Sequence, residues 1–75
     1  MRELLTEREI EILKTFANFN MHYQPTAEAV HYHRRTLFNI FAGIYKRTGL
    51  DPCSLWDLVN IIQTVDKEEL DGRKE

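Results

Sequence analysis

The sequence predicts an all-α fold, a small four-helix domain. Its 75 residues, 43% hydrophobic and 29% charged, suit one small globular domain rather than a disordered chain. Apolar residues recur at intervals of three and four in three separate stretches, as on one face of an amphipathic helix. Residues that typically begin and end helices stand between those stretches. We therefore expect one domain over residues 1–65, followed by a polar and disordered tail over 66–75.

The first helix is expected from Glu7 to Phe19. Thr6 and Glu9 have capping-box spacing, in which each side chain accepts a hydrogen bond from the other residue's backbone N–H. The apolar residues of this stretch share one stripe: Ile10, Leu13, Phe16 and Ala17. We expect this helix to support the rest of the fold.

A short second helix is expected from Pro25 to Val30, because proline is favoured at the first position of a helix. His31 and Tyr32 then make a turn. A third helix begins at His33 or Arg34 and continues to Thr48. Gly49 suits the left-handed conformation that ends many helices. Two helices joined by a tight turn predict a helix-turn-helix.

The third helix has two unlike faces when its residues are placed at 100° intervals. The inner face is apolar and consists of Leu37, Phe38, Ile40, Phe41, Ile44 and Tyr45. The outer face carries two cations, one amide and two very small residues: Arg35, Asn39, Ala42, Gly43 and Lys46. An exposed face of this kind suits close approach to a DNA groove, although an ordinary solvated face is the alternative.

A fourth helix is expected after Asp51 or Ser54, with Ser54 and Asp57 in capping-box spacing. Its predicted apolar stripe is Leu55, Leu58, Val59 and Ile62, with Trp56 and Ile61 to the sides. The predicted centre of the core comprises Ile10, Leu13, Phe16, Leu37, Phe41, Ile44, Leu58 and Ile62.

Charge is distributed unevenly along the chain. Residues 29–50 contain four Lys or Arg and no Asp or Glu, whereas the other residues carry six Lys or Arg and all 12 acids. The net charge of -2 therefore divides into +4 for this segment and -6 for the rest. The basic segment is the part expected to face a polyanion.

Several other classes of protein are disfavoured. The single Cys53 cannot form an intramolecular disulfide, which favours a reducing cytoplasm. No apolar run approaches the roughly 20 residues of a membrane span, so we expect a soluble, cytoplasmic protein without membrane contact. His22, His31, His33 and Cys53 match no closed zinc pattern. Neither an enzyme, a metal site nor a cofactor is expected.

The segment from Thr26 to Asp51 resembles a known family. Its matching residues are Thr26, Ala27, Val30, His33, Arg34, Thr36, Leu37, Thr48, Gly49 and Leu50. They resemble the C-terminal helix-turn-helix domain of the PucR and carbohydrate-diacid regulators, which is related in shape to Fis-type domains, and the similarity covers about residues 9 to 62. The resemblance implies DNA binding in transcriptional regulation. This chain differs from the family in having Phe38, Ile40, Ala42 and Gly43 where mid-helix arginines are usual, and no small-molecule effector domain is visible in it.

Sequence-specific binding of double-stranded DNA is the resulting hypothesis, with the segment Arg34 to Arg47 as the recognition helix. Arg35 would pair with guanine and Asn39 with adenine. The residues expected at the DNA are Gln24, Thr26, His33, Arg34, Arg35, Thr36, Asn39, Lys46 and Arg47. The alternative is a protein-protein interaction module on the same scaffold, and either function could involve a homodimer.

Overall fold

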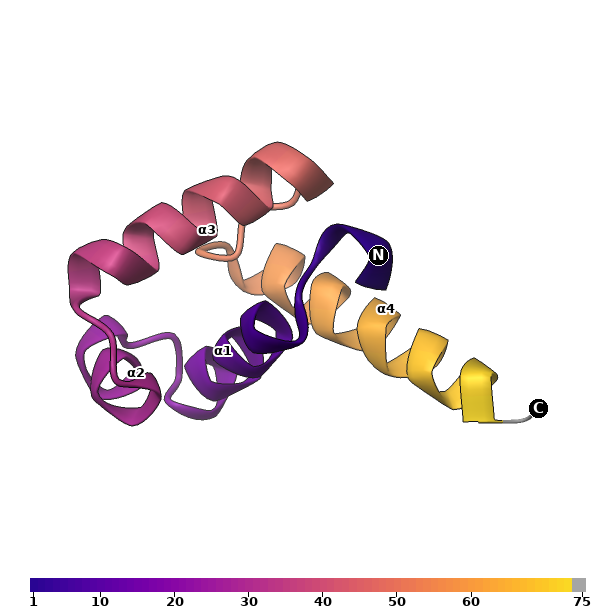
Figure 1. Ribbon diagram of the computed structural model, residues 1–75, viewed down its shortest axis with the longest axis horizontal. Helices are drawn as coiled ribbons and strands as arrows, with labels where there is room; N and C mark the ends of the chain where they lie inside the picture. Colours follow the sequence, from indigo (N-terminus) through magenta and orange to yellow (C-terminus); the bar gives the residue numbers. More distant parts are fainter. Residues whose placement is uncertain (74–75) are drawn as a thin grey trace.

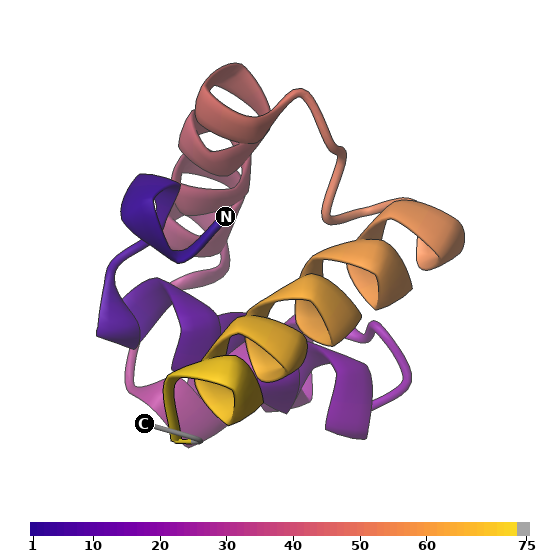
Figure 2. The ribbon, with the colours of Figure 1, turned by 90° about the vertical axis from the view of Figure 1, so that its right-hand side faces the viewer.

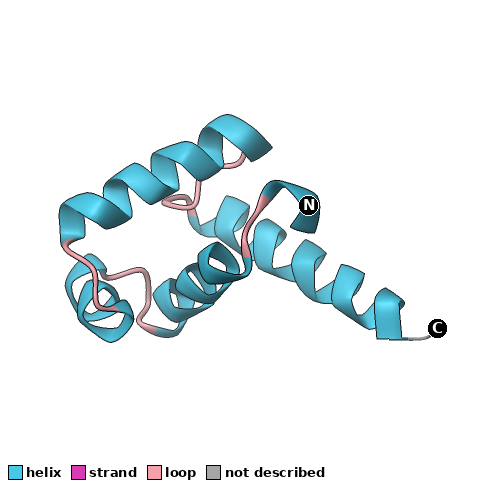
Figure 3. Ribbon diagram, viewed as in Figure 1, coloured by secondary structure: helices cyan, strands magenta, loops and turns pink. Residues whose placement is uncertain are grey.

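The computed structural model describes residues 1–73, and within this range it contains four α-helices and no strand (Figure 1). A short 3-10 turn, η1, comes first. The elements are η1 (Arg2–Leu4), α1 (Glu7–Asn18), α2 (Tyr23–Val30), α3 (Arg34–Thr48) and α4 (Leu55–Arg73). Short loops join these helices (Figure 3). The predicted all-α class is confirmed.

The start of α1 follows from its capping box. The Thr6 hydroxyl accepts a hydrogen bond from the Glu9 N–H at 3.1 Å, and the Glu9 carboxylate accepts one from the Thr6 N–H at 2.9 Å. Both bonds satisfy N–H groups that a helix start leaves without partners. The helix ends at Asn18, one residue before its predicted end.

The second helix, α2, begins two residues earlier than predicted. Tyr23 is its first residue, so Pro25 stands third and not first. Proline is tolerated there because the third N–H of a helix also lacks an intrahelical partner. His31 ends α2 in the left-handed conformation, with φ of 63°.

The third helix confirms its predicted limits. His33 occupies the N-cap position, and Gly49 ends the helix with φ of 76°. The Gly49 N–H donates to the Tyr45 carbonyl at 2.8 Å. In Figure 1, α2 is seen nearly along its axis, whereas α3 extends across the view. The two helices are therefore strongly inclined to each other.

The core confirms most of the predicted apolar residues but corrects the face of α4. Its buried hydrophobic residues are Leu5, Ile10, Ile12, Leu13, Phe16, Ala27, Val30, Leu37, Phe41, Ile44, Leu58, Ile61 and Val65. Among the described side chains of α4, Leu58, Ile61 and Val65 are buried, so Leu58 is the one member of the predicted stripe that lies in the core. Leu55 is 56% exposed, while Val59 and Ile62 are only partly buried.

The fourth helix extends into the segment that was predicted to be a polar tail. The helix α4 continues to Arg73, and its later turns project away from the other helices (Figures 1 and 2). Lys14 of α1 forms an ion pair with Asp66 at 2.8 Å, and the Met1 ammonium group bonds to Glu68 at 3.0 Å. These charged pairs attach Asp66 and Glu68 to the start of the chain and to α1, although their polar composition suggests a tail. Residues 74–75 of that predicted tail lie outside the described part.

Candidate nucleic-acid interface

One exposed stripe follows the length of α3. Arg35, Asn39, Ala42 and Lys46 are all exposed, as their outward placement predicted. They lie opposite the buried residues Leu37, Phe41 and Ile44, which fix the orientation of the helix. From Arg35 to Lys46 the stripe rises about 16 Å at 1.5 Å per residue. Among the described residues, no ion pair neutralises Arg35 or Lys46.

The first turn of α3 contributes further predicted residues. His33 is exposed, and its side chain makes no capping hydrogen bond. The Arg34 guanidinium carbon lies 6.0 Å from the centre of the Phe38 ring, within the range of a cation–π contact. Thr36 is half-buried. The first N–H groups of a helix have no intrahelical partners and can bind an anion.

Arg47, which was predicted to bind phosphate, is exposed but bonds to several groups of its own chain. Its guanidinium donates to both carboxylate oxygens of Glu9, to the Leu4 carbonyl at 2.9 Å and to the Gly43 carbonyl at 3.1 Å. The hydrogen bond from Arg47 holds the pKa of Glu9 below its ordinary value. Arg47 thus ties the end of α3 to the N-terminal residues and is already neutralised.

Thr26 cannot fill its predicted role either. Its side chain is fully buried, and its hydroxyl donates to the His22 carbonyl at 2.7 Å. Gln24 is exposed as expected, but its amide donates to the Glu28 carboxylate at 2.9 Å. An acid therefore lies beside Gln24 on α2, where a phosphate contact was expected.

Two aromatic side chains of α3 flank the exposed stripe, although both were predicted to face the core. Phe38 is 45% exposed and Tyr45 is 55% exposed. The Phe38 ring packs on Tyr23, with ring centroids 4.5 Å apart. The helix periodicity places these residues at the edge of the inner face, and that edge is not covered in so small a core.

Tyr23 also connects α2 to the loop before α4. Its hydroxyl lies 2.6 Å from the Cys53 sulfur. Burial, and then the hydrogen bond with Cys53, raise the pKa of Tyr23 well above its ordinary value. The phenol therefore stays neutral at physiological pH and acts as a structural contact beneath the first turns of α3.

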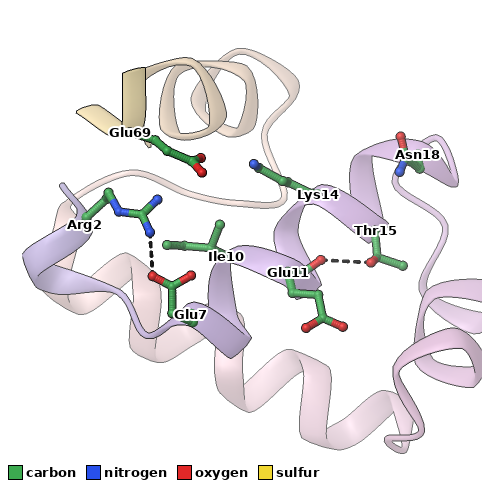
Figure 4. A pocket seen from close by; sticks show the side chains of 8 residues that line it. All are labelled: Arg2, Glu7, Ile10, Glu11, Lys14, Thr15, Asn18 and Glu69. Atoms are coloured by element: carbon green, nitrogen blue, oxygen red, sulfur yellow. Dashed lines mark hydrogen bonds and ion pairs between the residues drawn. The ribbon is translucent and has the colours of Figure 1, made fainter. Parts of the chain in front are cut away.

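A polar hollow of about 370 Å³ lies away from α3, between the N-terminal residues, α1 and α4 (Figure 4). Arg2 forms an ion pair with Glu7 across one side of it. The Thr15 hydroxyl donates to the Glu11 carbonyl at 2.8 Å. The charged residues that line the hollow are of both signs: Arg2, Glu7, Glu11, Lys14 and Glu69.

The described residues contain no group of three side chains arranged to hold a metal ion. None of the helices in this part of the chain has both the length and the apolar character needed to cross a membrane. Comparison of the chain with protein-family models, with curated proteins and with solved structures found no match. The similarity to the PucR regulators thus stays a prediction from sequence.

Proposed function

We propose that the protein binds double-stranded DNA through the exposed face of α3, with α2 and α3 acting as a helix-turn-helix. The observation that supports this most is the stripe formed by Arg35, Asn39, Ala42 and Lys46, which is exposed, basic and free of acids. An α-helix fits the major groove of B-form DNA, which is about 12 Å wide. The family resemblance points to the same function.

Each residue of the stripe has a distinct role in this proposal. Arg35, in the first turn, donates two hydrogen bonds to a guanine, and Asn39 pairs with an adenine one turn later. Ala42 lets the helix approach closely and can contact a thymine methyl group. Lys46 binds a phosphate at the far end of the helix, and Arg34 binds one at the near end.

The structure narrows the predicted set of contacts. Arg47 forms an ion pair with Glu9, and Thr26 is buried, so the proposal assigns neither of them a contact with DNA. Glu28 adds a negative charge beside Gln24. One domain therefore has few phosphate contacts, and we expect weak binding whose dependence on salt concentration is shallow.

The first prediction concerns Lys46 and Arg35. Lys46→Ala should weaken binding about equally on all DNA sequences and reduce the salt slope by roughly one unit. Arg35→Ala should cost about 1 to 3 kcal/mol on the preferred site and relax the preference at one base pair. Fluorescence anisotropy with labelled duplexes over a salt series measures both, after the preferred site has been selected from random DNA.

Lys67→Ala is the matched control, because it removes one exposed positive charge from α4 and leaves α3 unchanged. It should affect binding much less than Lys46→Ala does. Equal losses for the two variants would show that only overall charge matters. Absence of any enriched sequence would contradict specific recognition by α3.

A protein partner is the second candidate, and the exposed rings of Phe38 and Tyr45 favour it. Exposed aromatic residues are common at protein interfaces. Under this alternative the protein fails to bind duplex DNA even at low salt, so the same titration distinguishes the two functions.

A further inference from the structure

Phe38 lies at the edge of the exposed stripe, in the first half of α3. Its side chain is 45% exposed. At 100° per residue it lies about 60° from Arg35 and about 40° from Ala42 around the helix axis. The ring is therefore next to residues that the proposed function places at the edges of bases.

Neighbouring side chains hold the Phe38 ring in place. Tyr23 of α2 packs against it with ring centroids 4.5 Å apart, and Tyr23 in turn packs on the buried Phe16 ring at 5.2 Å. On α3 itself, the Arg34 guanidinium carbon lies 6.0 Å from the centre of the Phe38 ring. An exposed ring that is already held in this way loses little conformational freedom when it meets a ligand.

The apolar group that distinguishes base pairs in the major groove is the thymine methyl group. An A·T pair presents the adenine N7 and N6 groups on one strand, and the thymine O4 and methyl groups on the other. Phe38 and Asn39 are adjacent in α3, so they differ by about 1.5 Å along the helix axis and by about 100° around it. Since base pairs are stacked about 3.4 Å apart, the two side chains lie at the level of one base pair and are directed to opposite strands.

We propose that Phe38 contacts the methyl group of the thymine whose paired adenine is bound by Asn39, so that the two residues read one A·T pair from both strands. The proposal rests on the function given above, in which α3 enters the major groove. The contact of ring and methyl group buries apolar surface and displaces no hydrogen bond. It therefore adds base preference without adding charge, and it discriminates against pyrimidines that lack a 5-methyl group.

Deoxyuridine in place of this thymine tests the contact, because it removes the methyl group and leaves the hydrogen-bonding groups of the base pair unchanged. Competition fluorescence anisotropy on the selected duplex should show binding weakened about threefold to fourfold, as for one buried methyl group. The loss should be the same at each salt concentration, since no ion is released by the contact. The protein is unmodified in this measurement, so a change in its fold cannot cause the loss.

Two protein variants show which side chain meets the methyl group. Phe38→Ala and Tyr45→Ala form a matched pair, because each removes an exposed aromatic ring from α3. Phe38→Ala should bind the thymine and deoxyuridine duplexes equally, whereas Tyr45→Ala should keep the full preference for thymine. Changing the ring and the methyl group both singly and together isolates the contact between them. Circular dichroism confirms that each variant keeps its helices.

Equal binding of the two duplexes by the unmodified protein would overturn the proposal, and so would a preference for thymine that persists in Phe38→Ala. Either result leaves the guanine preference attributed to Arg35 in place, so DNA recognition by α3 would still stand. If no sequence is enriched from random DNA, the proposed function itself fails, and the role of Phe38 fails with it.

Discussion

Gly43 and Gly49 belong to the same segment, but they differ in whether the backbone at that position needs a glycine. Gly49 ends α3 with φ of 76°, a conformation that costs an L-residue about 1 to 2 kcal/mol. Gly43 lies inside α3, and a Cβ atom there would meet the Arg47 guanidinium at 3.6 Å, an ordinary contact distance. Only Gly49 therefore needs to be glycine for backbone reasons.

The second prediction follows from this pair. Gly43→Ala should raise the free energy of unfolding by about 0.5 to 1 kcal/mol, because glycine loses more backbone freedom on folding. Gly49→Ala should lower it by about 1 kcal/mol. Urea unfolding followed by circular dichroism measures both. Changes of the same sign in the two variants would contradict the assigned ends of α3.

Single residues show where sequence reasoning succeeds and where it stops. The positions of Arg35, Asn39 and Lys46 follow from helical periodicity, and their exposure is confirmed. The pairing of Arg47 with Glu9 was not predictable, since it joins residues 38 positions apart and depends on how α1 packs near α3. The capping box predicts that the Glu9 side chain is held in position, but it does not indicate that Arg47 is its partner.

At the scale of elements, α4 differs most from expectation. The apolar residues of its first half form a broad arc, and periodicity alone does not decide which edge of that arc is buried. The structure buries Leu58, Ile61 and Val65 and leaves Leu55 mainly exposed. Packing against α1 makes this choice, and it leaves the other edge to line an apolar groove.

The third prediction compares two apolar residues of α4. Ile61→Ala should lower the free energy of unfolding by about 2 to 5 kcal/mol, because its side chain is fully buried. Leu55→Ala should cost less than about 1 kcal/mol, since its side chain is 56% exposed. Thermal unfolding gives both values. If Leu55→Ala lowered the free energy of unfolding more than Ile61→Ala does, Leu55 would belong to the buried face of α4, as the sequence pattern predicts.

The start of α2 is a second feature that the sequence pattern does not predict correctly. Asn20 and Met21 both have positive φ, at 56° and 63°, although neither is glycine. This tight reversal after α1 lets α2 begin at Tyr23. Sequence patterns assign such conformations to glycine first, so the loop could be predicted but its length could not.

At the scale of the whole molecule, the N-terminal residues connect several elements through charge. The Glu9 carboxylate binds Arg47 of α3, and the Met1 ammonium group binds Glu68 of α4. Hydrogen bonds from these cationic partners hold the pKa of each carboxyl group below its ordinary value. A carboxyl group whose pKa is lowered by folding stabilises the fold above its unfolded pKa, about 4.3, and loses this contribution as the pH falls through its folded pKa.

The fourth prediction tests the Glu9 pair by pH. Glu9→Gln should lower the free energy of unfolding by about 1 kcal/mol at neutral pH, since the pair is partly exposed. The difference from the unmodified chain should shrink below about pH 4.3 and vanish in stronger acid. Glu11→Gln, in an exposed pair with Arg8, is the control and should have a smaller effect. A difference that does not change with pH would show that Glu9 stabilises through packing and not charge.

The position of α4 in the chain has a consequence for synthesis. Leu58, Ile61 and Val65 complete a core whose other members all precede residue 45. At about 5 to 20 residues per second, the ribosome needs roughly one to three seconds to make residues 49–65. During that interval the apolar side chains of the earlier helices lack their cover. The earlier helices therefore cannot complete their core until α4 has been made.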